Sequence, residues 1–234
     1  MKRNLLLEIL FPLRCTFCDT VLPLGEEKIC RSCMGKIRYL KGALCYCCGK
    51  PVKEEQEYCF DCSKTHHEFI QGAALFEYEF VRHSLYKFKY GGRKEYGVCY
   101  GDYMSRYFRN KLVQWKPQAL IPVPLHKKRM RKRGYNQAEV LANELSKYWQ
   151  IPVVKDLVIR RKNTRPMKEL DGVERQNNLK KAFLLGRNDV KLSTVIIIDD
   201  IYTTGNTIDA VASVCKEAGI KNIYFLTISI GSGL

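Results

Sequence analysis

The sequence lacks any uninterrupted apolar run of the roughly 18–20 residues that would cross a bilayer as a helix. Its opening segment, residues 1–12, is short and interrupted by Glu8, and no small-residue cleavage site follows, which is not typical of a signal peptide. We expect a helical turn packed on the cysteine-rich region that follows, with a weak membrane-surface contact as the alternative. These absences favour a cytoplasmic protein, either free or peripheral at the inner face of the membrane.

Acidic residues are also scarce, since 24 Asp and Glu stand against 40 Lys and Arg, a formal net charge of +16. Residues 1–65 hold 11 basic against 8 acidic side chains, whereas residues 66–234 hold 29 against 16, a net of +13. Such a charge favours a polyanionic partner or substrate and says nothing about the fold. The 234 residues leave room for one mid-sized α/β domain and a small satellite.

Cysteine is abundant but concentrated. Nine of the eleven cysteines lie in the first 62 residues, and eight form Cys-x-x-Cys pairs: Cys15/Cys18, Cys30/Cys33, Cys45/Cys48 and Cys59/Cys62. Two residues between thiolates let one tight turn direct both sulfurs at one metal ion, and two such turns complete a tetrahedral zinc site. The spacing repeats, with 11 residues between the first two pairs and 10 between the last two. We therefore predict a duplicated zinc ribbon over residues 1–65, with two structural zinc ions and sequential pairing, which closes the shorter loops.

Alternatives to two zinc ions are one zinc with the other half degenerate, and disulfides or a redox role. Gly49 follows the third pair, where a knuckle turn often requires glycine. We interpret Cys47 as a bystander, and Cys99 and Cys215 as small buried apolar groups in helices. No His, Asp or Glu stands at metal-ligand spacing with an open coordination position, which indicates structural rather than catalytic zinc.

The C-terminal end has the pattern strand, loop, helix, strand. Val195–Ile198 is typical of a strand buried on both faces, a helical stripe from Ile208 closes at Gly219, and Asn222–Ile230 predicts a second strand. In the loop, two carboxylates at a strand end can accept hydrogen bonds from sugar hydroxyls, and hydroxyls at a helix N-terminus can cradle a phosphate. The residues predicted to hold a ribose 5-phosphate are Asp199, Asp200, Thr203, Thr204, Gly205, Asn206 and Thr207.

The segment 195–207 resembles the phosphoribosyl-pyrophosphate (PRPP) signature of type I phosphoribosyltransferases: four apolar residues, two acids, two variable residues, then Thr-Thr-Gly-x-Thr. The resemblance implies the fold of that class for residues 66–234, an α/β parallel-sheet core with flanking helices, and PRPP bound together with Mg²⁺. The alternative for the two acids is a simple helix cap.

Two basic stretches lie upstream of this loop. Ala119–His126 predicts a buried strand ending in a basic loop, because six of the seven residues 127–133 are Lys or Arg, and Asn136 with Glu139 resembles a capping box that opens the next helix. The second stretch, residues 160–178, lies between strand-like segments 153–159 and 182–185 and is predicted to be a mobile flap. The first stretch suits pyrophosphate or a nucleic-acid backbone, with a solvated charged face as the alternative. The candidate anion-binding residues are Lys89, Arg93, His126, Arg133, Asn136, Gln137, Arg165 and Arg175.

Aromatic residues gather in one region, since residues 76–108 carry 11 of the 26. The alternation of Phe76, Tyr78 and Phe80 with Glu predicts a half-buried strand. Residues 86–93 interleave rings with cations, a pattern that suits the stacking of exposed bases, and core packing is the alternative for most of these rings.

Taken in order, six features resemble the ComF/GntX family of bacterial competence proteins. They are the doubled Cys-x-x-Cys module, Lys89–Arg93, Val123–His126, Arg133–Gln137, Thr164–Pro166 and the signature loop. The resemblance spans residues 15–207 and implies a role in natural transformation: the handling of single-stranded DNA entering the cytoplasm, together with a membrane-associated helicase of the same system. It gives a site and no acceptor.

Three functions therefore stay open. The first is a DNA-handling protein whose PRPP site binds ligand without turnover, and the second is an active phosphoribosyltransferase in which Asp199 and Asp200 hold the ribose diol. The third is a zinc-ribbon scaffold for a protein partner. Neither an acceptor pocket nor a catalytic base can be assigned from the sequence, so we name no catalytic residue.

Overall fold

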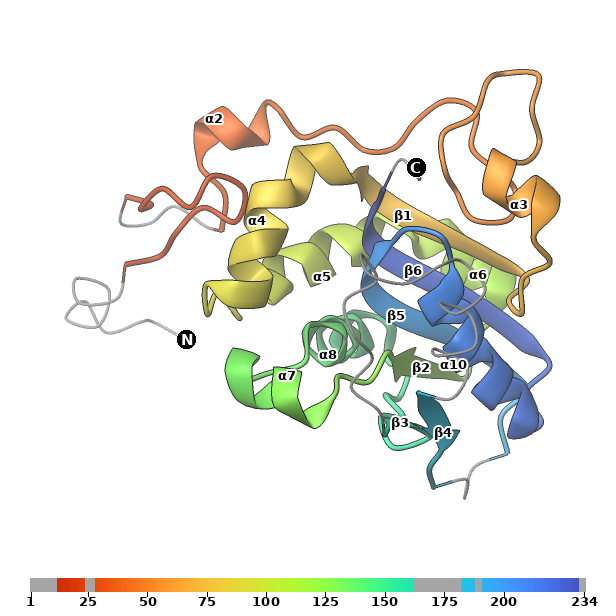
Figure 1. Ribbon diagram of the computed structural model, residues 1–234. Coiled ribbons are helices and arrows are strands. Elements are labelled where there is room, and N and C mark those ends of the chain that lie inside the picture. The colour runs from red at the N-terminus through yellow and green to blue at the C-terminus, as the bar shows by residue number, and fades with distance from the viewer. Residues whose placement is uncertain (1–11, 24–27, 162–181, 188–190, 232–234) are drawn as a thin grey trace.

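The computed structural model describes residues 12–23, 28–161, 182–187 and 191–231, shown in Figure 1. The predicted N-terminal helical turn and most of the predicted flap, with Arg165 and Arg175, lie outside the described residues. None of the helices in the described part of the chain has the length and hydrophobicity needed to span a membrane.

A four-stranded sheet of order β1-β6-β5-β2 forms the centre. Its strands are β1 (Gln71–Glu77), β2 (Ala119–Pro122), β5 (Thr194–Tyr202) and β6 (Asn222–Ile230). All three pairings are parallel, so the carboxyl ends of the strands meet at one edge. The α/β parallel-sheet fold expected from the sequence is confirmed.

Both faces of the sheet are covered, as a parallel sheet requires. Helices α4 (Tyr78–Tyr90), α5 (Tyr96–Tyr107), α6 (Arg109–Trp115) and α8 (Gln137–Trp149) pack on the face of β5 that carries Ile196 and Ile198. The opposite face, with Val195 and Ile197, is covered by α10 (Asn206–Glu217) and an antiparallel hairpin of β3 (Val158–Arg160) and β4 (Phe183–Leu185). The alternation along β5 thus supplies two core clusters from one strand.

The two cysteine units lie on opposite faces of this sheet (Figure 1). The first, drawn in red with α2 (Arg31–Met34), packs on α5 through Cys15 and Cys99. The second, drawn in orange with α3 (Phe60–Lys64), joins the core beneath α10, and the N–H of Gly72 in β1 donates to the carbonyl of Cys47 at 2.8 Å. As predicted, Cys99 and Cys215 are fully buried in helices.

Three local predictions were wrong. The strand expected through Phe80 ends at Glu77, because Tyr78 and Phe80 lie on α4, where helical spacing buries Val81, Leu85 and Phe88 instead. The basic loop of residues 127–133 is a helix, α7 (Lys127–Arg133), which His126 caps by accepting from the N–H of Lys128. The strand expected over residues 153–159 is split into a single bridge at Val153 and the short β3.

Candidate functional site

The eight paired cysteines form two compact groups in the predicted sequential pairing. The ligand atoms within each group, Cys15/Cys18/Cys30/Cys33 and Cys45/Cys48/Cys59/Cys62, lie within 4.8 Å of one another. The Sγ atoms of Cys18 and Cys30 are 3.8 Å apart and those of Cys48 and Cys59 are 3.6 Å apart. Four sulfurs at about 2.3 Å from a tetrahedral zinc lie about 3.8 Å from each other, so both groups fit a structural zinc site with four cysteine ligands.

The knuckle turns explain why each pair converges on one point. The backbone is left-handed directly after the third pair, at Gly49 with φ of 78°, and again at the corresponding position of the first pair, Asp19, with φ of 61°. Each turn is closed by a bond to the first cysteine, from the N–H of Asp19 to the carbonyl of Cys15 and from the N–H of Gly49 to that of Cys45, both at 2.9 Å. The duplication seen in the sequence is therefore a duplication of backbone geometry.

One partner of the second site escaped the sequence reading. Cys47, interpreted as a bystander, lies with Cys62 and His67 in a third group whose ligand atoms are within 4.8 Å. His67 Nε2 is 3.4 Å from the Sγ of Cys62. The only sequence signal for His67 was the pair of histidines, His66 and His67, shortly after the last paired cysteine. That pair does not predict a contact with the cysteines until the fold brings His67 against α10.

The loop predicted to cradle a phosphate lies at the carboxyl edge of the sheet, between β5 and α10. β5 continues through both acids to Tyr202, so Asp199 and Asp200 lie within the strand and not after it. Gly205, at φ of 85°, is the N-cap of α10 and accepts from the N–H of Asp209 at 2.8 Å. Thr203 and Thr204 are exposed there. The predicted segment thus forms a left-handed turn at a helix N-terminus, with exposed hydroxyls beside it.

The two acids of β5 differ in their surroundings, since consecutive strand residues face opposite sides. The carboxylate of Asp200 pairs with Lys89 Nζ at 2.8 Å, and both side chains are largely buried. Burial, and then the charge of Asp200, raises the pKa of Asp199 to about 7, against the opposing charges of Lys89 and Arg160. Asp199 is therefore the acid of this pair that titrates near neutral pH.

This pKa gives a stability prediction. An unfolded Asp titrates near 3.9, so between about pH 4 and pH 7 the folded chain binds one proton more than the unfolded chain. Stability contributed by protonated Asp199 is therefore lost as pH rises from 4 through 7. We expect Asp199→Asn to reduce the fall in apparent Tm between pH 5.5 and pH 8 by about 3 °C or more, measured by calorimetry. An identical fall in both proteins would contradict this assignment.

The other candidate anion-binding residues separate into two sets. Lys89 pairs with Asp200 at the end of β5, and Arg133 lies beside the helix that carries Lys89, donating to Gln137 Oε1 and to the hydroxyl of Tyr90 at 3.0 Å each. By contrast, Arg93 pairs with Asp19 of the first ribbon at 3.3 Å. Asn136 caps α8 and donates to the carbonyl of Val123, while the buried Gln137 amide donates to the carbonyl of Phe88. Glu139, the predicted capping partner, pairs with Lys155 instead.

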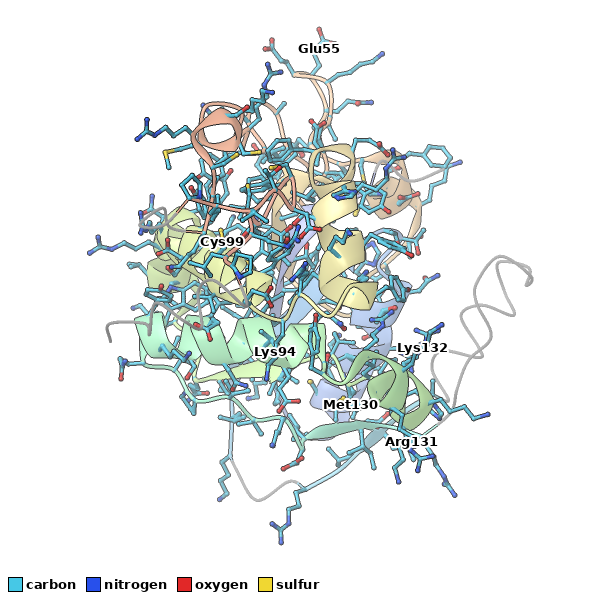
Figure 2. All side chains as sticks on the ribbon, turned by 90° about the vertical axis from the view of Figure 1, so that its left-hand side faces the viewer. Glu55, Lys94, Cys99, Met130, Arg131 and Lys132 are labelled. Carbon is cyan, nitrogen blue, oxygen red and sulfur yellow. The ribbon has the colours of Figure 1, made fainter. Side chains whose placement is uncertain are left out.

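A cavity of about 470 Å³ opens between α4 and β5 beside the Lys89–Asp200 pair. It is lined by Tyr78, Arg82, His83, Leu85, Tyr86, Lys89, Tyr90 and Ile201. Tyr86 and Tyr90 are 60% and 54% exposed, with ring centroids 5.2 Å apart, and the Arg133 guanidinium lies 4.7 Å from the ring centre of Tyr90. Figure 2 shows α7 on the same side of the molecule as α4, with Met130, Arg131 and Lys132 at its outer surface. Exposed rings and cations therefore share one surface.

Comparison with known proteins agrees with this architecture. A double zinc ribbon domain model matches residues 6–63, and a phosphoribosyl transferase domain model matches residues 102–229. Competence protein F of Haemophilus influenzae is 28% identical over 221 residues, which cover 91% of this chain and 95% of that protein. Competence protein ComFC of Bacillus subtilis is 29% identical over 201 residues, covering 83% and 80% respectively.

A third relative is DNA utilization protein YhgH of Escherichia coli (strain K12), 27% identical over 213 residues, covering 88% of this chain and 91% of that protein. Among solved structures, an adenine phosphoribosyltransferase matches with a TM-score of 0.38 and 14% identity, over 63% of this chain and 75% of the other. The phosphoribosyl transferase match alone extends over more than half of the residues. The chain belongs to the phosphoribosyl transferase domain family, and with its double zinc ribbon it is a homologue of the competence protein F and ComFC proteins.

Proposed function

We propose that this is a competence-related protein that binds single-stranded DNA on the surface formed by α4 and α7, next to a loop that binds PRPP with Mg²⁺. Residues 1–65 serve as its zinc-ribbon domain and residues 66–234 as its phosphoribosyltransferase-like domain. The relatives named for competence and for DNA utilization support the DNA role. A competence helicase of the uptake system is the proposed protein partner.

The observation that carries the proposal is the ion pair of Lys89 with Asp200. Lys89 belongs to the helix that displays the exposed rings, and Asp200 to the part of the signature segment that lies in β5, at an Nζ–Oδ1 distance of 2.8 Å. A phosphate-rich ligand that attracts Lys89 therefore acts on the carboxylate proposed to hold the ribose of PRPP. The two polyanion sites share one residue pair, so their occupancies should be coupled.

The surface has the two components that single-stranded nucleic acid needs. Tyr86 and Tyr90 offer adjacent exposed rings on which bases can stack, a contact worth about 1–3 kcal/mol for each base. Arg82 and Arg133, with the exposed lysines and arginines of α7, supply cations for the backbone phosphates. This reading accounts for two neighbouring tyrosines whose rings are more than half exposed.

The PRPP loop is assigned by the chemistry of its residues. Thr203, Thr204, Thr207 and the N–H groups of the α10 N-terminus suit the 5-phosphate, while Asp199 and Asp200 suit the ribose and its Mg²⁺-bound pyrophosphate. PRPP with Mg²⁺ should bind more tightly above pH 7, where Asp199 is ionised.

The test is fluorescence anisotropy with labelled single-stranded DNA at two salt concentrations, with and without Mg·PRPP. For about four phosphate contacts, a fourfold rise in salt should weaken binding about 50-fold. Tyr86→Ala and Tyr90→Ala together should weaken it at least about tenfold. The control is Tyr148→Ala, which removes a 47% exposed tyrosine from α8 and should change nothing. Equal losses in all variants, or binding that ignores salt, would contradict the assignment.

Phosphoribosyl transfer is the second candidate function, and the cavity beside Ile201 favours it by offering a place for a flat acceptor next to the loop. If DNA affinity is the same with and without Mg·PRPP, the two sites are independent. Pyrophosphate release in the presence of DNA and of free bases then becomes the deciding measurement.

A further inference from the structure

His67 lies between the second zinc site and the phosphate loop. Its side chain is 2% exposed, and both ring nitrogens have a partner. Nδ1 lies 2.8 Å from Oδ2 of Asp209 on α10, and Nε2 lies 3.4 Å from the Sγ of Cys62, a ligand of the second zinc site. One buried ring therefore touches a metal ligand on one side and the phosphate-loop helix on the other.

Asp209 is held from two directions. Its second carboxylate oxygen accepts the backbone N–H of Glu68 at 2.8 Å. Two consecutive residues that follow the second ribbon, His67 and Glu68, therefore both contact the Asp209 side chain. Its own N–H donates to the carbonyl of Gly205, which closes the first turn of α10. The position of Asp209 thus determines the position of the turn whose N–H groups would face the phosphate.

The ring of His67 also packs directly on the loop. A Cβ atom built on Gly205 would lie 2.9 Å from Cε1 of His67 and 2.8 Å from the hydroxyl oxygen of Tyr202. The ring also stacks on Phe69, with centroids 4.6 Å apart. A turn of the imidazole would break its contacts with Asp209 and with the sulfur of Cys62.

We propose that His67 is a positioning residue that couples zinc occupancy of the second ribbon to the conformation of the phosphate loop. Zinc fixes Cys62, Cys62 orients the imidazole, and the imidazole holds Asp209 and supports Gly205. This coupling rests on the proposed role of the loop as the PRPP site. It makes the second zinc a determinant of ligand affinity as well as a structural ion.

The two zinc sites are unequal in this respect. The first ribbon is held by two helices: the Ser84 hydroxyl on α4 donates to the carbonyl of Thr16, and the Tyr96 hydroxyl on α5 donates to the carboxylate of Asp19. The contacts of the second ribbon reach α10. Coupling is therefore assigned to the second zinc alone. It is reciprocal at equilibrium: a ligand that binds more tightly to the zinc-loaded protein also raises the affinity for that zinc, which we expect to see as slower zinc release.

The experiment measures zinc release to a chromogenic chelator from the full-length protein loaded with two zinc ions. His67→Gln and Asp209→Asn should each speed release of one zinc about tenfold and leave the other unchanged. The matched control is His66→Gln, which replaces the exposed neighbouring histidine and should release both ions at the wild-type rates. An effect of Asp209→Asn is diagnostic, because Asp209 lies on α10 and is no zinc ligand.

Mg·PRPP should slow release of the same zinc from the wild type and have no effect on it in His67→Gln. Amide hydrogen exchange over residues 203–209, measured without ligand, should rise in both variants while far-UV circular dichroism stays unchanged. Wild-type release rates and wild-type exchange in both variants would overturn the coupling, even where PRPP binds. If calorimetry detects no binding of PRPP to the wild type, the proposed function fails, while the ligand-free release and exchange rates still decide whether His67 links the two elements.

Discussion

Replacing Cys48 by serine is expected to reduce bound zinc from two ions per chain to one and to unfold the second ribbon. Cys48 is fully buried, its sulfur lies 3.6 Å from that of Cys59, and it belongs to the core cluster beneath α10. A structural zinc contributes about 10–16 kcal/mol in zinc-finger peptides, comparable with the entire stability of a typical domain. Elemental analysis and thermal unfolding check the result.

Cys47→Ser is the matched control, because Cys47 is the adjacent residue and lies outside the group of four paired cysteines. This variant should keep two zinc ions and unfold within about 3 °C of the wild type. If Cys47→Ser loses a zinc and Cys48→Ser does not, the second site uses Cys47, Cys62 and His67, and the ligand set described above is wrong.

The second large effect is expected at Gly205. Alanine at this position is destabilised in two ways. The left-handed backbone, at φ of 85°, costs about 1–2 kcal/mol for a residue with a Cβ atom, and that Cβ would overlap with His67 and Tyr202. Because this turn faces the proposed phosphate, Gly205→Ala should lower PRPP affinity by at least about tenfold, or ~1.4 kcal/mol, besides destabilising the fold. Calorimetry with Mg·PRPP measures the affinity.

Gly219→Ala separates these two costs. Gly219 lies just beyond the other end of α10 at nearly the same φ, 86°, and nothing lies within 4 Å of a Cβ built there. Both variants should lose about 2–4 °C in Tm for each kcal/mol of backbone strain, but only Gly205→Ala should also lose PRPP binding. Equal PRPP affinity in the two variants would mean that the turn at Gly205 does not contact the ligand.

The parts of the fold that sequence reasoning predicted correctly are those set by local pattern. Three elements could each be predicted from a few neighbouring residues. The apolar run 195–198 predicted β5, the helical stripe closed by Gly219 predicted α10, and Asn222–Ile230 predicted β6. The cysteine pairing was also predictable, because a Cys-x-x-Cys turn directs two thiolates at one metal ion and sequential pairing closes the shorter loops.

Prediction was wrong where tertiary context decided between two readings. Phe76, Tyr78 and Phe80 alternate like a strand, but the burial of Val81, Leu85 and Phe88 outweighs that short alternation and starts a helix at Tyr78. Lys127–Arg133 has too few apolar residues to show a helical stripe, and its helix depends on the cap at His126. Neither conflict can be resolved from the segment alone.

The candidate site was predictable as a list of residues and not as a set of contacts. Lys89, Asp199 and Asp200 were all predicted as site residues. Nothing in the sequence predicts that Lys89 and Asp200 lie 2.8 Å apart, because they are separated by more than one hundred residues. The pairing of His67 with Asp209 spans 142 residues and was missed. Long-range contacts of single polar side chains leave no periodic signal.

The order of the strands also restricts how the chain can be made. β1 pairs only with β6 in the described sheet, and Gln71 meets Tyr224, about 150 residues further along the chain. The ribosome must therefore release β6 before β1 can find its neighbour, while the ribbons upstream of β1 need only zinc and their own residues to fold. Until β6 is made, β1 has no strand partner on either side. The second ribbon, whose Cys47 carbonyl accepts from the N–H of Gly72 in β1, is available to shield it during that time.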